Sequence, residues 1–167
     1  MLEGRYTRTG PATAPAAPGC IYDDAAYLAS FSGAATLVAE IAGGPQALDQ
    51  ISLRLVSLPP PPAGPSPFDS RAEDLSRCSS IRESLPGGGS RTWTAIKHPI
   101  VNTGGEAGYA VVYMLPDGTG IRHIQVGARK GTLCVETETK TLSDAAVLQA
   151  ARGLAATINK VMARVGS

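Results

Sequence analysis

Three cysteines and two histidines are the side chains in this 167-residue chain best suited to metal binding or nucleophilic chemistry: Cys20, Cys78, Cys134, His98 and His123. Zinc sites commonly pair their ligands as C-x-x-C or H-x-x-x-H, and all five residues are isolated here. A catalytic thiol needs a histidine as its base, and neither histidine lies in a recognisable motif. We expect no metal, no cofactor and no catalytic residue. A cytosolic enzyme with Cys134 or Cys78 as nucleophile stays an alternative.

Two further roles are open to the cysteines, a buried free thiol and a disulfide. In "KGTLCVETETK" (130–140) the alternation puts Leu133 and Val135 on one face of a strand and Cys134 on the other. We favour a Cys78–Cys134 disulfide, which would close a loop of about 55 residues and stabilise the fold by roughly 4 kcal/mol. Such a bond is typical of an oxidising compartment. Cys20 is then left over, as an incidental or a lipid-modified cysteine.

Aromatic residues supply the first candidates for ligand binding. Trp93 is the only tryptophan, and Tyr109 and Tyr113 lie on neighbouring predicted strands. Together they are suited to line an open sheet face as a ligand platform, with core packing as the alternative.

Basic residues supply the second set of candidates. Arg122, Arg129 and Lys130 are expected to gather near one hairpin end, with His123 between them. They suit an anionic ligand or headgroup, and the alternative is a set of solvated charges that protects a sheet edge.

Composition limits the classes of partner. The net charge of +1 gives no field that would attract nucleic acid, so we expect no nucleic-acid partner. No apolar run approaches the roughly 18 residues of a membrane helix, so membrane contact would require an upstream anchor absent from this chain. The segment "TGPATAPAAPGC" resembles the spacer that separates such an anchor from an exported domain.

The elements of the first half are harder to assign than those of the second. Residues 1–20 are rich in Pro and Ala and predict a disordered linker, followed by a single domain over 21–167. Residues 21–31 slightly favour a strand, and Ser32 suits the cap of a helix over 33–43. A helix over 45–50, a strand to Leu58 and a Pro-rich surface loop over 59–68 follow.

A capping box, Ser70 and Glu73, predicts a short helix that carries Cys78 on or near its buried face. Four strands separated by turn sequences follow, and Ser143 starts a long final helix with one apolar stripe. The strands are expected over 91–101, 108–115, 121–128 and 132–139, and the stripe comprises Val147, Ala151, Leu154, Ile158, Val161 and Val165.

These elements predict an α+β fold in which an antiparallel meander has helices packed on one face. The final helix and the 33–43 helix should cover that face, while the other face meets water. Cys134 would lie on the water-facing side, which argues against its being a filler of the helix-covered core.

The order of "DLSRC", a Gly-rich turn, "TWTAI", "GGEAGYAVVY", "IRHIQVGARKGTLCVET" and a long last helix resembles exported sensor-type domains of actinobacteria. These are the extracellular domains of PknH-type serine/threonine kinases and related lipoproteins, and the likeness covers about 25–165. It implies a disulfide-held sheet backed by helices, with a cleft that binds a ligand without catalysis. The chain departs from the kinase version because three cysteines cannot form its two disulfides and its front is shorter.

The expected function is therefore a non-enzymatic extracytoplasmic sensor or ligand-binding module at the cell envelope. Its partner would be a small molecule or an envelope component. A lipid- or cell-wall-handling lipoprotein is the alternative from the binding proteins, and a deep apolar cavity would favour it.

Overall fold

A computed structural model describes residues 17–42, 50–59 and 63–165, and it confirms the α+β class. The helices are α1 (Ala25–Ala29), α2 (Pro67–Leu75) and the long α3 (Val147–Val165). The strands are β1 (Ala17–Asp23), β2 (Ala35–Ala42), β3 (Gln50–Ser57), β4 (Cys78–Ser84), β5 (Ser90–Lys97), β6 (Ala107–Met114), β7 (Arg122–Lys130) and β8 (Leu133–Thr141).

All eight strands form one sheet in the order β1-β4-β5-β6-β7-β8-β3-β2. Strands β4 to β8 are an antiparallel meander, so the expected run of hairpins is confirmed and extended by one strand. β3 and β2 continue the antiparallel pairing beyond β8, and β1 pairs with β4 in parallel at the other edge.

The expected helix over 33–43 is wrong, because Ala35–Ala42 is strand β2. Its backbone pairs with β3 from Ala35 opposite Ser57 to Ala42 opposite Gln50. The sequence "ATLVAEIA" suits both states locally, and pairing with a distant strand decides between them. The expected 45–50 helix lies outside the described residues except for Gln50, which starts β3.

The linker assigned to 1–20 is too long, because Ala17–Cys20 belongs to β1, whereas 1–16 lie outside the described residues. The region 21–31 divides into the end of β1 and helix α1. The Pro-rich loop also ends earlier than expected, since Pro67 and Phe68 begin α2.

Helix α2 is capped by Ser66, whose hydroxyl accepts a hydrogen bond from the Asp69 amide at 3.1 Å. Pro67 occupies its first turn, where a missing amide hydrogen costs nothing. The expected capping box at Ser70 is therefore wrong, since Ser70 lies inside the helix. Cys78 lies beyond the helix and begins strand β4.

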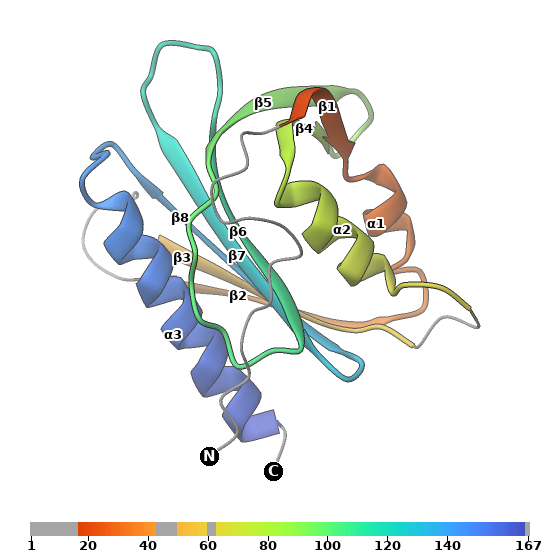
Figure 1. Cartoon of the computed structure of the whole chain (residues 1–167). Helices are drawn as coiled ribbons and strands as arrows, with labels where there is room; N and C mark the ends of the chain where they lie inside the picture. The colour runs from red at the N-terminus through yellow and green to blue at the C-terminus, as the bar shows by residue number, and fades with distance from the viewer. Residues whose placement is uncertain (1–16, 43–49, 60–62, 166–167) are drawn as a thin grey trace.

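Helix α3 covers one face of the sheet and makes the first of two cores (Figure 1). Its apolar stripe is confirmed from Val147 to Ile158, whereas Val165 at the end of the helix is exposed. The sheet contributes aliphatic side chains alone to this core: Leu53, Ala110, Val112, Ile124, Val126, Ala128 and Val135.

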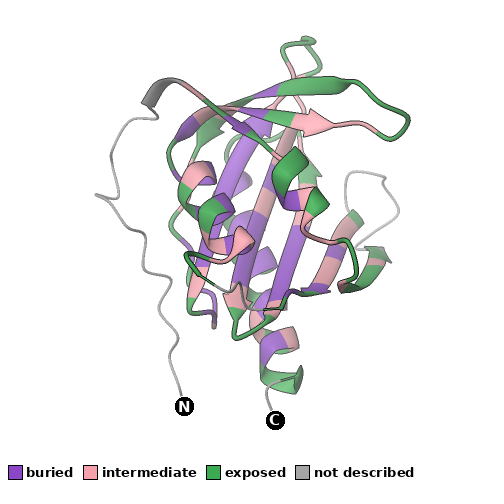
Figure 2. Ribbon diagram, turned by 90° about the vertical axis from the view of Figure 1, so that its right-hand side faces the viewer, coloured by how far each residue is buried: buried purple, intermediate pink, exposed green. Residues whose placement is uncertain are grey.

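Helices α1 and α2 lie on the opposite face, which the sequence predicted to meet water (Figure 1). Figure 2 shows the central strands buried along much of their length. The second core is richer in aromatic and sulfur side chains than the first, and its members include Tyr22, Tyr27, Phe68, Trp93, Tyr109, Tyr113, Cys78 and Cys134. The sheet is thus covered on both faces, and this face carries the polar groups described below.

Gly127 on β7 makes room for the ring of Tyr109 in the second core. A Cβ atom at Gly127 would lie 2.5 Å from Cε1 of Tyr109, which is fully buried. We expect Gly127→Ala to destabilise the fold by about 1–3 kcal/mol through overpacking. Urea unfolding measures this.

Gly153→Ala is the matched control, because its added methyl meets no atom within 4 Å. Gly153 lies inside α3, where alanine is the better helix former by up to about 1 kcal/mol. A Gly127→Ala variant as stable as the parent would contradict the packing described here.

Candidate ligand-binding cleft

A cleft of about 290 Å³ opens on the sheet face that carries α1 and α2. It receives side chains from both helical segments and from strands β3 to β8. Its lining residues are Asp24, Leu28, Arg54, Arg71, Ile81, Glu83, Ser84, Pro86, Trp93, Tyr113, Gln125 and Glu138. Charged and amide groups make up half of this lining, so the cleft suits a small polar ligand.

The alternation of β8 builds the floor of this cleft. Leu133 and Val135 pack toward α3, and the next residues, Glu136 and Glu138, point to the opposite face. Arg54 of β3 pairs with Glu136 across one side of β8, and Gln125 of β7 pairs with Glu138 across the other. The two glutamates of β8 are therefore flanked by long polar side chains of the neighbouring strands β3 and β7.

The side chain of Arg71 on α2 extends to this floor, and the residue is only 7% exposed. Its Nε donates to Glu136 Oε1 at 2.9 Å, its Nη1 to the hydroxyl of Tyr22 at 2.8 Å, and its Nη2 to Gln125 Oε1 at 3.3 Å. A buried charge needs this degree of pairing. One side chain thus links α2 to strands β1, β7 and β8.

Tyrosine rings enclose the Arg71 guanidinium. Its central carbon lies 5.2 Å from the ring centre of Tyr22, 4.6 Å from that of Tyr27 and 5.5 Å from that of Tyr109. Such contacts attract a cation to the ring face. Burial alone would lower the pKa of Arg71, but Tyr109 and Glu136 raise it well above its ordinary value. The guanidinium therefore stays charged.

Tyr109 completes the network from below. Burial raises the pKa of its hydroxyl well above the ordinary value, so the group stays protonated and donates to Glu136 Oε1 at 2.5 Å. The other carboxylate oxygen, Oε2, is buried and accepts no hydrogen bond from the described residues. Nη1 of Arg54 lies 3.8 Å from it.

A second polar group, formed by His123, Glu138, Tyr113 and Trp93, lies at the β5–β7 side of the cleft. His123 Nδ1 lies 3.0 Å from Glu138 Oε1, and the hydroxyl of Tyr113 donates to Oε2 at 3.1 Å. The His123 ring stacks on Tyr113 and lies 4.3 Å from the Trp93 ring centre. Burial raises the pKa of Glu138, but the hydrogen bonds from His123 and Tyr113 outweigh it, and the pKa lies below its ordinary value.

This lowered pKa predicts a stability that depends on pH. The contribution of Glu138 is fully present above its ordinary pKa of 4.5 and is lost as the pH falls through the lower folded value. We expect the parent to lose more stability than Glu138→Gln over that acid range, as measured by urea unfolding at stepped pH. Glu73→Gln, at an exposed position on α2, is the control and should follow the parent. Equal acid sensitivity of the parent and Glu138→Gln would contradict the prediction.

The aromatic candidates of the sequence do meet on this face. Trp93 and Tyr113 line the cleft, and the Trp93 indole donates to Glu83 Oε2 at 2.7 Å. Tyr109 lies beneath, closed off from solvent within the Arg71 network. Trp93 and Tyr113 thus line the cleft, whereas Tyr109 supports it from beneath.

The basic candidates do not gather, so that expectation is wrong. Arg122 begins β7 whereas Arg129 and Lys130 end it, and an extended strand keeps its ends apart. Arg129 is bound to Asp69 at 2.8 Å, and Arg122 to Asp144 at 3.3 Å. None of the three basic residues lines the cleft.

The sequence reasoning missed the polar residues that build the site. Arg71 lies in a helix with an amphipathic sequence, and Arg54 takes a polar position in the alternation of "ISLRLVSL", so both residues suit solvent exposure. The signal available was in "VETETK", where Glu136 and Glu138 share the face of Cys134. A buried cysteine on that face implies that Glu136, two residues further along the strand, lies in the interior as well.

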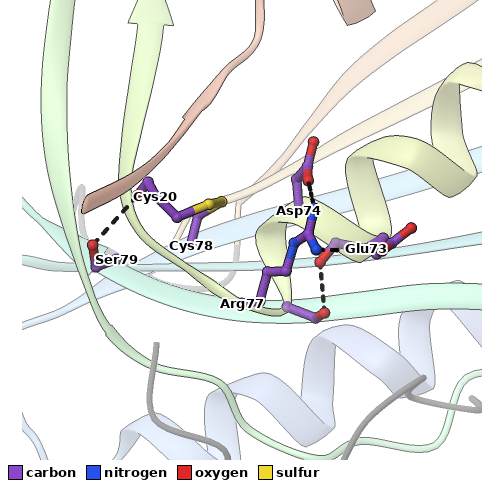
Figure 3. Close-up of a disulfide and its surroundings, with 7 residues drawn as sticks. Cys20, Glu73, Asp74, Arg77, Cys78 and Ser79 are labelled. Carbon is purple, nitrogen blue, oxygen red and sulfur yellow. Dashed lines mark hydrogen bonds and ion pairs between the residues drawn. A yellow bond between two sulfur atoms is a disulfide. The ribbon is translucent and has the colours of Figure 1, made fainter. Parts of the chain in front are cut away.

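The cysteine pairing expected from the sequence is also wrong. Cys78 is bonded to Cys20 of β1, its neighbour in the sheet (Figure 3). Cys134 is free. Three strands separate β4 from β8, which corresponds to roughly 19 Å along the sheet, whereas disulfide Cα atoms lie within about 7 Å. The bond closes a separation of 58 residues and ties the edge strand β1 to the meander.

Cys134 fills the core beneath α2 and is 1% exposed. Burial raises the pKa of its thiol to about 12, with Glu136 adding to the effect. The thiolate that a nucleophile requires is therefore disfavoured. The expectation that Cys134 is not a core residue is wrong, because helices α1 and α2 cover this face.

Cys134 should accordingly be inert in the folded protein. We expect Ellman's reagent to react with it at least about 100-fold more slowly in buffer than in urea, because reaction requires local opening. Cys134→Ala is the control and should show no reaction in either solvent. Rapid reaction of the folded parent would contradict its burial and restore the cysteine-enzyme alternative.

The described residues contain neither a metal-binding cluster nor a membrane-spanning helix. Over residues 17–42, 50–59 and 63–165, no group of three or more His, Cys, Asp or Glu is placed to hold a metal ion. No helix in the described part of the chain is long and apolar enough to cross a membrane. No known family model, curated protein or solved structure matches this chain. The cleft and its lining are therefore the features that bear on function.

Proposed function

We propose that this chain is a non-enzymatic, extracytoplasmic sensor or ligand-binding module at the cell envelope, and that the cleft is its ligand site. The observation that carries the proposal is the cleft itself, a polar hollow on a sheet face held by a buried charge network. Buried ionic networks are costly and are common at functional sites. A rigid floor with accessible polar side chains above it suits recognition of a small molecule.

The compartment is argued from the Cys20–Cys78 bond. Disulfides persist in oxidising environments outside the cytoplasm and are rare inside it. The resemblance to exported sensor domains of actinobacterial PknH-type kinases and related lipoproteins agrees with this compartment and remains part of the proposal. The chain still departs from the kinase version, because it has one disulfide where the kinase domain has two.

Two alternatives receive less support. A lipid-handling lipoprotein would use a deep apolar cavity, whereas this cleft is lined by Arg54, Glu83, Glu138 and other polar groups. An enzyme with a Cys134 nucleophile would need an accessible thiolate, and burial disfavours one.

Trp93 provides the test, because the only tryptophan of the chain lines the cleft. The purified chain is titrated with a panel of small polar molecules: glycylglycine, succinate, putrescine and glucose. We expect at least one to change the Trp93 fluorescence saturably and to raise the melting temperature. Ser84→Phe, which adds a large side chain at a lining position, should abolish both effects, whereas Gln149→Phe on the exposed side of α3 should not.

Two results would overturn the proposal. One is that no panel member changes fluorescence or melting temperature. The other is that binding survives in Ser84→Phe, which would place the ligand elsewhere. Circular dichroism of each variant establishes that the fold is intact before binding is compared.

A further inference from the structure

Apart from Glu138, whose carboxylate is held by His123 and Tyr113, the charged groups of the cleft lie on two walls of opposite sign. Arg54 lies on β3 and Arg71 reaches the floor over β8 and β7. Asp24, just before α1, and Glu83 on β4 lie on the opposite wall, where the Asp24 carboxylate accepts from the Ser84 amide at 2.8 Å. A ligand in this cleft would meet cations at one end and carboxylates at the other.

The cationic wall has hydrogen-bond donors that the protein does not use. Gln125 accepts from Arg71 through its Oε1, which turns its amide nitrogen, with two hydrogens, away from that guanidinium. Arg54 has one ion pair, at 3.8 Å, and no hydrogen bond to the described residues. Five N–H groups on Arg54 and two on Gln125 are thus available beside the cleft.

The acidic wall has acceptors that are likewise free. Glu83 takes the Trp93 indole and the Arg91 guanidinium on Oε2, and its Oε1 accepts nothing from the described residues. Asp24 uses Oδ1 for the Ser84 amide and leaves Oδ2 open. A cation that donates hydrogen bonds complements these oxygens.

From these two walls we propose that the cleft binds a small zwitterion of the amino-acid or dipeptide class, with its carboxylate at Arg54 and Gln125 and its ammonium at Asp24 and Glu83. This inference rests on the proposed function and names the class of ligand. A purely anionic ligand would leave the free oxygens of Asp24 and Glu83 without a donor, and a purely cationic one would leave the free N–H groups of Arg54 without an acceptor. A cleft of about 290 Å³ is large enough for a dipeptide of small residues.

Three related dipeptides test both ends of the ligand. Glycylglycine has both charges, N-acetylglycylglycine lacks the ammonium, and glycylglycinamide lacks the carboxylate. With Trp93 fluorescence as the readout, we expect glycylglycine to bind at least tenfold more tightly than either derivative. Glycine alone, as a fourth ligand, distinguishes a single amino acid from a dipeptide as the better fit.

Variants assign each charge to its wall. Arg54→Gln should remove the preference for glycylglycine over glycylglycinamide, and Asp24→Asn, which keeps an acceptor for the Ser84 amide, should remove the preference over the acetylated peptide. Arg54→Lys should retain the first preference because it retains the charge. Arg152→Gln, on the exposed side of α3, is the neutralised control and should change neither.

Gln125→Glu keeps the test decisive if Arg54→Gln does not fold. A glutamate there retains the acceptor for Arg71 but replaces the free amide by a carboxylate, so glycylglycine should bind at least tenfold more weakly. Equal affinity for glycylglycine and glycylglycinamide, or an unchanged preference in Arg54→Gln, would overturn the zwitterion. If succinate, putrescine or glucose binds in the cleft and no dipeptide does, the zwitterion falls while the proposed function stands. If nothing binds, both fall.

Discussion

Replacing Arg71 by alanine should destabilise the folded chain by about 3–5 kcal/mol, the cost of leaving one member of a buried ion pair without its partner. The group left behind is Glu136, which is 3% exposed. The same change removes the donors to Tyr22 and Gln125. Urea unfolding, followed by circular dichroism, measures the loss.

Arg77→Ala is the matched control, because Arg77 follows the same helix but is exposed and, among the described residues, forms ion pairs only with Glu73 and Asp74 (Figure 3). Its loss should be below about 1 kcal/mol. The double variant Arg71→Ala with Glu136→Gln should recover part of the stability, because it removes the stranded charge. If Arg71→Ala costs no more than Arg77→Ala, the network does not hold the helix on the sheet.

Removing the disulfide should have the second large effect. Cys20→Ser opens a loop of 58 residues, for which the chain-entropy model gives about 4 kcal/mol, an upper value for most measured bonds. Strand β1 should be released first, since the bond ties this edge strand to β4. Adding dithiothreitol should lower the stability of the parent to that of Cys20→Ser and leave the variant unchanged.

A thiol count and one further variant identify the partners of the bond. The unfolded, non-reduced chain should show one free thiol, that of Cys134. Cys134→Ala should keep the full response to dithiothreitol. A response that disappears in Cys134→Ala would mean that Cys134 is bonded instead, and a count of three thiols would mean that no disulfide forms.

The second half of the fold could be predicted because its signals are local. Connections of two to nine residues that contain turn sequences separate strands β5 to β8, and period-two alternation fixes the face of each side chain. The same logic predicted the stripe of α3, because a helix of this length shows its period within its own sequence. Only pairing partners next to each other in the chain were needed.

The first half failed where distant strands decide the structure. "ATLVAEIA" has enough alanine for a helix and enough β-branched residues for a strand, and its eight backbone partners on β3 settle the choice. The prediction of the partner of Cys78 was wrong for a related reason. Strand β1, which carries Cys20, pairs with β4 in parallel, and no local sequence pattern predicts a parallel neighbour.

The sequence by itself determined the fold class, the meander, the final helix and the face on which Cys134 points. It could not show that α1 and α2 cover that face, because the apolar side of a helix does not indicate which surface it packs against. The site depends on that covering. Arg71 meets Glu136 across 65 residues, and only the docking of α2 on the sheet makes these two charged residues a buried pair beneath a cleft.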